Sequence, residues 1–173
     1  ICPLHGPILN ENIEYYINKY DIWSSYRAEN EGVMIAYVSM HGNTAQAVKE
    51  LKAKLEENGV PKVAIADLAR DDMAEAIEDS FRYDKLVVAS PTYDGALFPV
   101  VEDFLYHLKL KNYQSRKVAI IQNGSWAPMS GKKMKEYFES MKNITLCDTV
   151  VTIKSTLNTS SREQINTLAK ELV

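Results

Sequence analysis

Residues 39–44 combine small hydroxyl and amide side chains around a glycine. They read Ser39-Met40-His41-Gly42-Asn43-Thr44 and lie between a short apolar run and the first helical pattern. Such a loop offers backbone N–H groups and hydroxyl donors at a helix N-terminus, where the helix dipole also favours an anion. The segment therefore predicts a phosphate-binding loop that needs no lysine or arginine. An ordinary helix cap by Ser39 or Asn43 is the structural alternative.

Two later loops place aromatic residues among glycine, proline and hydroxyl side chains. The first of them reads Ser90-Pro91-Thr92-Tyr93-Asp94-Gly95-Ala96-Leu97-Phe98-Pro99. The other reads Asn123-Gly124-Ser125-Trp126-Ala127-Pro128-Met129-Ser130-Gly131. Tyr93 and Trp126 could stack on a flat tricyclic ring such as a flavin, although a single aromatic loop residue more often serves packing. It is the combination of three such loops that favours a flavin site.

Other nucleotide or phosphoryl sites match these loops poorly. The first loop has no G-x-G-x-x-G pattern. The run 130–133 resembles the end of a P-loop, but Trp126 stands where the first glycine belongs and Lys133 where Ser or Thr belongs. A phosphorylation receiver needs an acidic pair after the first strand and an aspartate after the third, and this chain has Ser39-Met40 and Ser90-Pro91 there.

The elements that must position these loops alternate regularly from Val33 onward. Short apolar runs rich in β-branched residues are typical of parallel strands covered on both faces, and they span 33–38, 63–66, 86–89, 118–121 and 150–153. Apolar residues at helical spacing follow each run, within 48–55, 73–77, 100–108, 134–141 and 165–172. Gly59 is suited to end the first helix, and Asp71-Asp72 to begin the second.

This alternation predicts an α/β fold, a flavodoxin-like three-layer sandwich around a five-stranded parallel sheet in the order 2-1-3-4-5. Ligands of such sheets bind beyond the carboxyl ends of the strands, near the switch in strand order. The three loops follow strands one, three and four. We therefore expect them to meet at one edge of the sheet.

A family resemblance follows from these loops. S-x-x-G-N-T resembles the flavodoxin phosphate loop, usually T/S-x-T-G-x-T, and S-P-T-Y-D-G-A-L-F-P resembles a loop of flavodiiron proteins (A-type flavoproteins), typically G-S-P-T-Y-N-x-G-x-F-P. The resemblance implies flavin mononucleotide (FMN) as cofactor. It assigns the phosphate to Ser39, His41, Gly42, Asn43 and Thr44, one side of the ring to Pro91, Thr92, Tyr93, Asp94 and Gly95, and the other side to Gly124, Ser125 and Trp126, with Met40 and Asn123 completing the set.

Two departures from the family pattern stand out. His41 occupies a position where the family often has Tyr or Thr, which puts a titratable group beside the predicted phosphate. The third loop, G-S-W-A-P-M-S-G, has one residue more than the family's G-S-Y-G-W-S-G.

Residues 1–32 stand outside the alternation. Apolar residues within 13–23 are spaced like a short amphipathic helix that packs on another surface, and the run Cys2-Pro3-Leu4-His5-Gly6-Pro7 resembles the end of the family's metallo-β-lactamase-like domain. The resemblance thus divides the chain into 1–32, the tail of that domain plus a connector, and 33–173, the flavodoxin-like domain. The start at Ile1 rather than Met suggests a piece of a longer protein.

His5 resembles one di-iron ligand of the parent family. The other histidines, His41 and His107, fall in other elements, and a di-iron centre needs several histidines and carboxylates held together. We therefore expect no di-iron site, and no other metal site, in this chain. His107 is expected at the surface.

The resemblance implies an electron-transfer domain that relays electrons to the di-iron site of a flavodiiron oxygen or nitric oxide reductase. Its partners would be a donor such as rubredoxin or a flavin reductase and the di-iron domain, in a head-to-tail homodimer. No general acid, base or nucleophile is then needed in the domain. The alternatives are a self-sufficient NAD(P)H–quinone reductase and a flavin-free interaction module.

Charge and cysteine usage narrow the function classes further. The formal net charge is −3 without a long basic run, which argues against nucleic acid or an anionic membrane as partner. No stretch approaches the ~20 apolar residues of a membrane span, and no signal-peptide pattern is present. Cys2 and Cys147 form no CxxC pair, so neither a disulfide framework nor a zinc motif is expected. A cytoplasmic setting fits these features.

Overall fold

The predicted strands form a parallel sheet in the computed structural model, which describes residues 1–173. The strands of this sheet, in the spatial order β2-β1-β3-β5-β6, are β2 (Val63–Asp67), β1 (Asn30–Tyr37), β3 (Tyr83–Tyr93), β5 (Lys117–Asn123) and β6 (Thr145–Ile153). Ile35 pairs with Val87, and Val87 with Ala119. The predicted order is confirmed. The sequence did not predict β4 (Ala96–Leu97), which pairs antiparallel with the end of β3.

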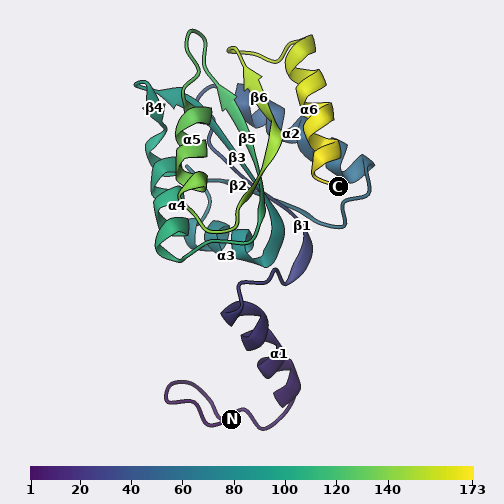
Figure 1. Cartoon of the computed structure of the whole chain (residues 1–173), viewed down its shortest axis with the longest axis vertical. Helices are drawn as coiled ribbons and strands as arrows, with labels where there is room; N and C mark the ends of the chain where they lie inside the picture. The colour runs from purple at the N-terminus through teal and green to yellow at the C-terminus, as the bar shows by residue number, and fades with distance from the viewer.

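Helices cover both faces of the sheet, as Figure 1 shows. α2 (Asn43–Glu57) and α6 (Thr159–Glu171) pack on one face, and α3 (Met73–Arg82), α4 (Pro99–Leu110) and α5 (Ser130–Glu139) on the other. Successive strand residues alternate between the two cores, so Val33 and Ile35 face one side while Met34 and Ala36 face the other. This two-sided burial explains why the strands are nearly continuous apolar runs.

The helix ends match several sequence signals. The Asp72 carboxylate accepts a hydrogen bond from the Ala74 amide at 2.7 Å and caps α3. Gly59 has a φ of 86° just after α2, the left-handed conformation that glycine adopts freely. The alternative of an ordinary helix cap by Ser39 or Asn43 is wrong. The N-cap of α2 is Gly42, and neither side chain caps the helix with a hydrogen bond.

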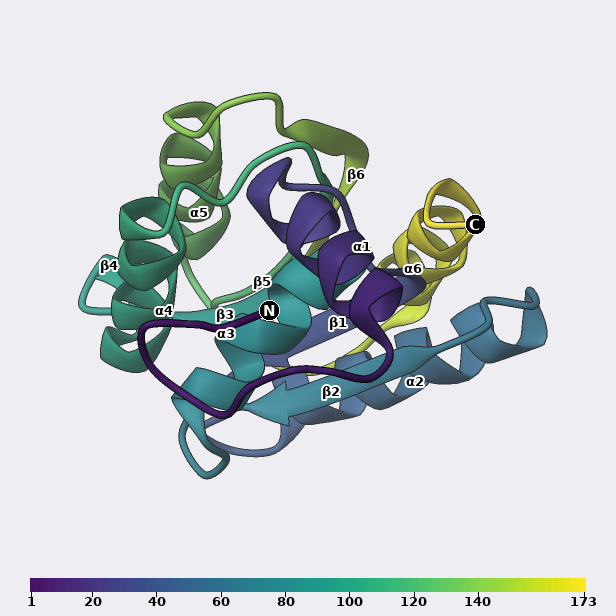
Figure 2. The ribbon, with the colours of Figure 1, turned by 90° about the horizontal axis from the view of Figure 1, so that it is seen from below.

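The N-terminal arm, residues 1–24, leaves the sheet at the amino ends of the strands. Its helix α1 (Ile13–Ser24) projects away from the sandwich in Figure 1, and it lies in front of the sheet when the molecule is seen from below in Figure 2. The helix is confirmed, but none of its side chains is buried, and Tyr20 is 72% exposed. This chain therefore supplies no surface for the apolar side of α1. No helix of the chain is both long enough and apolar enough to cross a membrane.

Arg116 joins the connector behind α1 to the base of the sheet. The side chain is buried, and it donates hydrogen bonds to the carbonyl oxygens of Tyr26 (2.6 Å), Phe81 (2.7 Å) and Tyr83 (2.9 Å). Burial lowers the pKa of this guanidinium. A buried guanidinium needs several acceptors, and here main-chain carbonyls provide them. Arg116 thereby fixes where the connector leaves the sheet.

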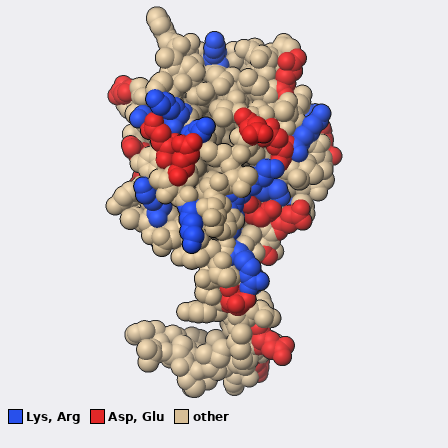
Figure 3. Space-filling model, in the orientation of Figure 1, with Lys and Arg blue, Asp and Glu red and all other residues tan.

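Positively and negatively charged side chains are intermixed on the surface and do not form separate patches. On the face shown in Figure 3, Lys and Arg alternate with Asp and Glu over the sandwich, and the N-terminal arm is mostly uncharged. His107 lies at the surface of α4, as predicted, and is partly exposed, with its ring 3.2 Å from the Asp103 carboxylate.

Candidate functional site

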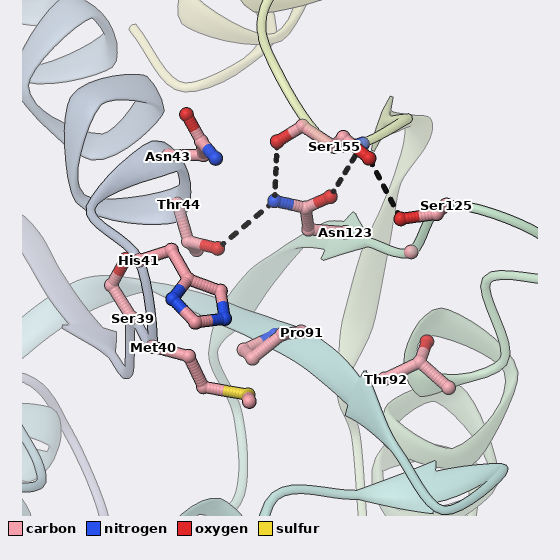
Figure 4. Close-up of a pocket in the computed structure, with 11 residues that line it drawn as sticks. Ser39, Met40, His41, Asn43, Thr44, Pro91, Thr92, Asn123, Ser125 and Ser155 are labelled. Carbon is pink, nitrogen blue, oxygen red and sulfur yellow. Dashed lines mark hydrogen bonds between the residues drawn. The ribbon is translucent and has the colours of Figure 1, made fainter.

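A cavity of about 260 Å³ lies at the carboxyl ends of the strands. Its lining is mostly polar, as Figure 4 shows, and comes from the ends of β3 and β5, from the loops after β1, β5 and β6, and from the start of α2. The predicted second loop thus begins inside β3, which extends to Tyr93. The lining residues are Ser39, Met40, His41, Asn43, Thr44, Pro91, Thr92, Asn123, Gly124, Ser125 and Ser155. The structure therefore brings together most of the residues that the sequence predicts. Gly42, Tyr93, Asp94, Gly95 and Trp126 lie outside this lining.

The first loop leads directly from β1 into α2. Gly42 turns the chain with a φ of 86°, after which the first amides of the 15-residue helix have no acceptor within the helix. The Ser39 hydroxyl is buried and has no hydrogen-bond partner in the chain. A buried donor without a partner costs about 1–3 kcal/mol, so an acceptor from a ligand would satisfy it. Helix N-terminus and hydroxyl together suit an anion such as a phosphate.

Asn123 connects three of the four loops from the end of β5. The residue is only 8% exposed, and its amide nitrogen lies 3.4 Å from the Thr44 hydroxyl oxygen and 3.2 Å from the Ser155 carbonyl oxygen. Its side-chain oxygen accepts from the Ser155 amide at 3.1 Å. Because Asn123 donates to the Thr44 oxygen, the proton of that hydroxyl remains available to a ligand.

Ser155 is the lining residue that the sequence analysis missed. It follows β6 in a left-handed conformation with a φ of 67°, and its hydroxyl oxygen lies 2.7 Å from that of Ser125. The sequence could have indicated this residue, because the last predicted strand runs parallel to its neighbour and ends at the same edge of the sheet. The run Lys154-Ser155-Thr156 places hydroxyl side chains at that strand end.

Thr92 connects the second loop to the third. Its hydroxyl oxygen accepts hydrogen bonds from the amides of Met129 (2.9 Å), the N-cap of α5, and Ser130 (3.2 Å), the first residue of that helix. The Ser130 hydroxyl in turn donates to the Ser90 carbonyl at 2.9 Å. Gly124 packs here as well, and a Cβ on it would lie 3.0 Å from Pro128 Cα and 3.2 Å from the Thr92 hydroxyl. A side chain at position 124 would push the two loops apart.

The two predicted stacking residues lie at the rim. Tyr93 is 41% exposed and contacts Phe98 edge to face, with 5.4 Å between ring centroids. Trp126 is 97% exposed at the tip of the third loop. Asp94 and Gly95 form the turn between β3 and β4 with φ values of 47° and 71°. Both aromatic rings are thus accessible to a flat ligand that extends out of the cavity.

The cavity is electrically neutral apart from the helix dipole. None of its lining residues is Lys, Arg, Asp or Glu, and His41 is the one histidine among them. His5 lies in the N-terminal arm, which extends from the end of the sheet opposite to the cavity (Figure 1). No group of three or more His, Cys, Asp or Glu residues is arranged to hold a metal ion.

Known structures share this architecture. The rubredoxin oxygen:oxidoreductase of Desulfovibrio gigas superposes with a TM-score of 0.84 at 21% identity, over 92% of this chain and 39% of that chain. A mutant flavo di-iron protein from Thermotoga maritima gives 0.79 at 23%, over 98% and 43%. A flavodoxin from the domain Archaea gives 0.70 at 16%, over 83% and 96%.

The family comparison covers most of the sequence. The chain spans about two fifths of the length of the curated relatives that it matches, with shares of 39%, 44% and 42%. A family model described as a flavodoxin domain matches residues 34–172, from the first strand of the sheet to the last helix. The chain therefore belongs to the flavodoxin domain family.

Proposed function

We propose that this chain binds FMN at the four-loop cavity and serves as the electron-transfer domain of a flavodiiron protein. The observation that carries the proposal is the Ser39 hydroxyl, which is buried without a partner beside the N-terminus of α2. A phosphate monoester would supply the missing acceptor and would be stabilised by the helix dipole. Membership of the flavodoxin domain family supports the same ligand.

The loops divide the cofactor between them in this proposal. Residues 39–44 hold the phosphate through the Ser39 and Thr44 hydroxyls and the amides at the start of α2. Residues 91–95 lie on one side of the ring and residues 123–126 on the other, with Tyr93 and Trp126 as the stacking partners. Thr92 and Asn123 act mainly by holding the loops together, because their polar atoms already bind protein groups.

The protein's part in electron transfer is to bind and orient the cofactor. FMN supplies the redox chemistry when bound, and the surrounding groups set its potential. We assign no catalytic acid, base or nucleophile to this chain. The uncharged lining leaves the phosphate as the main charge at the site.

The N-terminal arm bears on the route of the electrons. We propose that residues 1–32 are the end of a metallo-β-lactamase-like domain plus a connector, and that residues 33–173 form the FMN domain. The arm leaves the amino end of the sheet, whereas the cavity lies at the carboxyl end (Figure 1). A di-iron domain attached through this arm would lie on the side remote from its own chain's FMN. This favours transfer to the di-iron site of a second subunit in a head-to-tail homodimer.

The electron donor is proposed by analogy with a relative. The D. gigas protein that shares this fold is a rubredoxin oxygen:oxidoreductase by name. We propose rubredoxin, or a flavin reductase, as the donor to this chain. Oxygen or nitric oxide would be the final acceptor.

The test is a titration of the flavin-free protein with FMN, followed by flavin fluorescence, with riboflavin as the matched ligand without phosphate. We expect one FMN per chain, quenching by Tyr93 or Trp126, and weaker binding of riboflavin. A protein that is folded by circular dichroism and binds neither flavin would overturn the proposal. Rapid NAD(P)H–quinone turnover by the loaded protein would instead favour a self-sufficient reductase.

A further inference from the structure

His41 is the one ionisable side chain in a cavity that is otherwise neutral. Its imidazole extends from the first loop across the cavity toward Pro91, with Met40 and Thr44 close by (Figure 4). The hydrogen bonds that organise the site run between Asn123, Thr44, Ser125 and Ser155 and leave this ring free. The ring is exposed and can both accept a proton and turn toward a ligand.

Charged groups of the surrounding elements stay out of the cavity. Asp67 at the end of β2 is paired with Arg70 at 2.6 Å. Along the other elements the first charged residues are Lys49 and Glu50 on α2, Asp94 after β3, Lys132 on α5 and Lys154 after β6, and none of them lines the cavity. Among the side chains that line the site, His41 is therefore the one that can become a cation beside an anion.

A phosphate monoester brings about 1.5 to 2 negative charges at pH 7. An anion close to an imidazole favours its protonated form, and by linkage the protonated imidazole favours the anion by the same factor. Imidazole changes its charge between pH 5 and 8, so the effect falls within the ordinary working range of proteins.

We propose that His41 couples FMN binding to the uptake of a proton, so that the domain holds FMN more tightly as the pH falls through neutrality. The inference rests on the proposed FMN site and adds its regulation. Its sign follows from the bound anion: the proton is held more strongly in the complex, so the gain is present at low pH and is lost as the pH rises. Riboflavin has no phosphate and should show no such coupling.

Nuclear magnetic resonance can follow His41 in the unmodified protein. The chain has three histidines, and His5 and His107 lie on elements away from the cavity and serve as internal controls. We expect FMN, added at pH 7, to move the His41 ring signals toward those of a protonated imidazole. The ring signals of His5 and His107 should stay unchanged, and riboflavin should move none of the three. Unmoved His41 signals in the FMN complex would overturn the proposal.

Calorimetry with His41→Gln gives a second test. Glutamine keeps a polar side chain without the charge change, and FMN's own phosphate ionisation affects both proteins equally. Titrating FMN in buffers of different ionisation enthalpy at pH 7 should give net proton uptake in the wild type beyond that of the variant. Between pH 6 and 8, wild-type affinity for FMN should fall about tenfold relative to the variant.

The outcomes separate the inference from the function on which it rests. If both proteins bind FMN with the same proton uptake and pH profile, the His41 coupling is wrong and the FMN site stands. If riboflavin shows the same pH difference, His41 responds to the ring and the phosphate coupling is wrong. If neither folded protein binds FMN at any pH, the proposed function itself fails.

Discussion

The two ends of the sheet hold their connecting segments by different chemistry. At the amino end, the buried Arg116 cation gathers the carbonyls of Tyr26, Phe81 and Tyr83. At the carboxyl end, the neutral Asn123 amide and the Thr92 hydroxyl do the equivalent work for four loops. Both sets of bonds are made by side chains on or beside the strands, so the sheet holds both sets of side chains in place.

The two ends differ in whether they leave hydrogen-bond donors free for a ligand. An arginine among the site loops would pair with a bound anion instead of holding the loops together, and an aspartate would repel the anion. Neutral connectors satisfy the loop backbone while the amides of α2 and the Ser39 hydroxyl stay free for a ligand. At the amino end, by contrast, the hydrogen bonds of the buried Arg116 cation all go to main-chain carbonyl oxygens.

Replacing Arg116 should have the largest effect, and on stability. Arg116→Met leaves three buried or partly buried carbonyls without this donor, and we expect the free energy of unfolding to fall by about 3 kcal/mol. Urea denaturation measures it. The matched control is Arg162→Met, which breaks an exposed pair with Glu50 at 3.2 Å and should cost less than about 1 kcal/mol. Equal losses would refute the anchoring role, whereas FMN affinity of the folded Arg116→Met protein should be unchanged.

Asn123→Asp should place a negative charge in the uncharged cavity at the carboxyl end of the sheet. The carboxylate keeps the shape but loses the donors to Thr44 and Ser155, and it faces the phosphate. We expect FMN affinity at pH 8 to fall about a hundredfold, close to 3 kcal/mol at short range in a partly screened site. Riboflavin should lose much less. Fluorescence titration of both ligands compares them, and equal losses would show that no phosphate lies near Asn123.

Thr92→Val should loosen the third loop without changing charge. The amides of Met129 and Ser130 lose their acceptor, and we expect a loss of about 1–2 kcal/mol in unfolding free energy. FMN and riboflavin should weaken together, because the ring side of the site moves. Thr92→Ser keeps the oxygen and should behave like the wild type in both measurements. A selective loss of FMN in Thr92→Val would mean that Thr92 binds the phosphate instead.

Thr44→Val should have the smallest and most selective effect. The hydroxyl accepts from Asn123 and has its proton left for the phosphate, so FMN should weaken about tenfold, the value of one hydrogen bond to a charged group. Riboflavin binding should be nearly unchanged. An equal loss for both flavins would argue against residues 39–44 as the phosphate site.

Periodicity, together with the general rules for crossovers in parallel sheets, was enough to predict the layers and the strand order. Two-sided burial makes each strand a short apolar run, with Val33 and Met34 in different cores, and the right-handed crossovers set which helix covers which face. The two-residue β4 is too short to leave a pattern, so the sequence could not predict it. The packing of α1 was also out of reach, because most of its apolar side chains stay exposed in this chain.

The site was predictable as a set of loops but not as a set of contacts. Residues 39–44 follow from local composition at a helix start. Ser155 does not, because its place depends on Asn123, 32 residues earlier, and on a left-handed backbone at a non-glycine residue. Likewise nothing local says that the Thr92 hydroxyl turns toward the α5 amides rather than into the cavity. Such directions are set by tertiary contacts.

Arg116 has a consequence for how this unit can be inherited. It reads the connector only through a main-chain carbonyl, that of Tyr26, and every amino acid carries the same carbonyl. This bond therefore depends on the path of the backbone, including the left-handed conformation of Tyr26, and not on the side chain at that position. The upstream sequence can change, by substitution or by gene fusion, so long as that path and the bonds of Lys19 and Trp23 to Glu29 are kept.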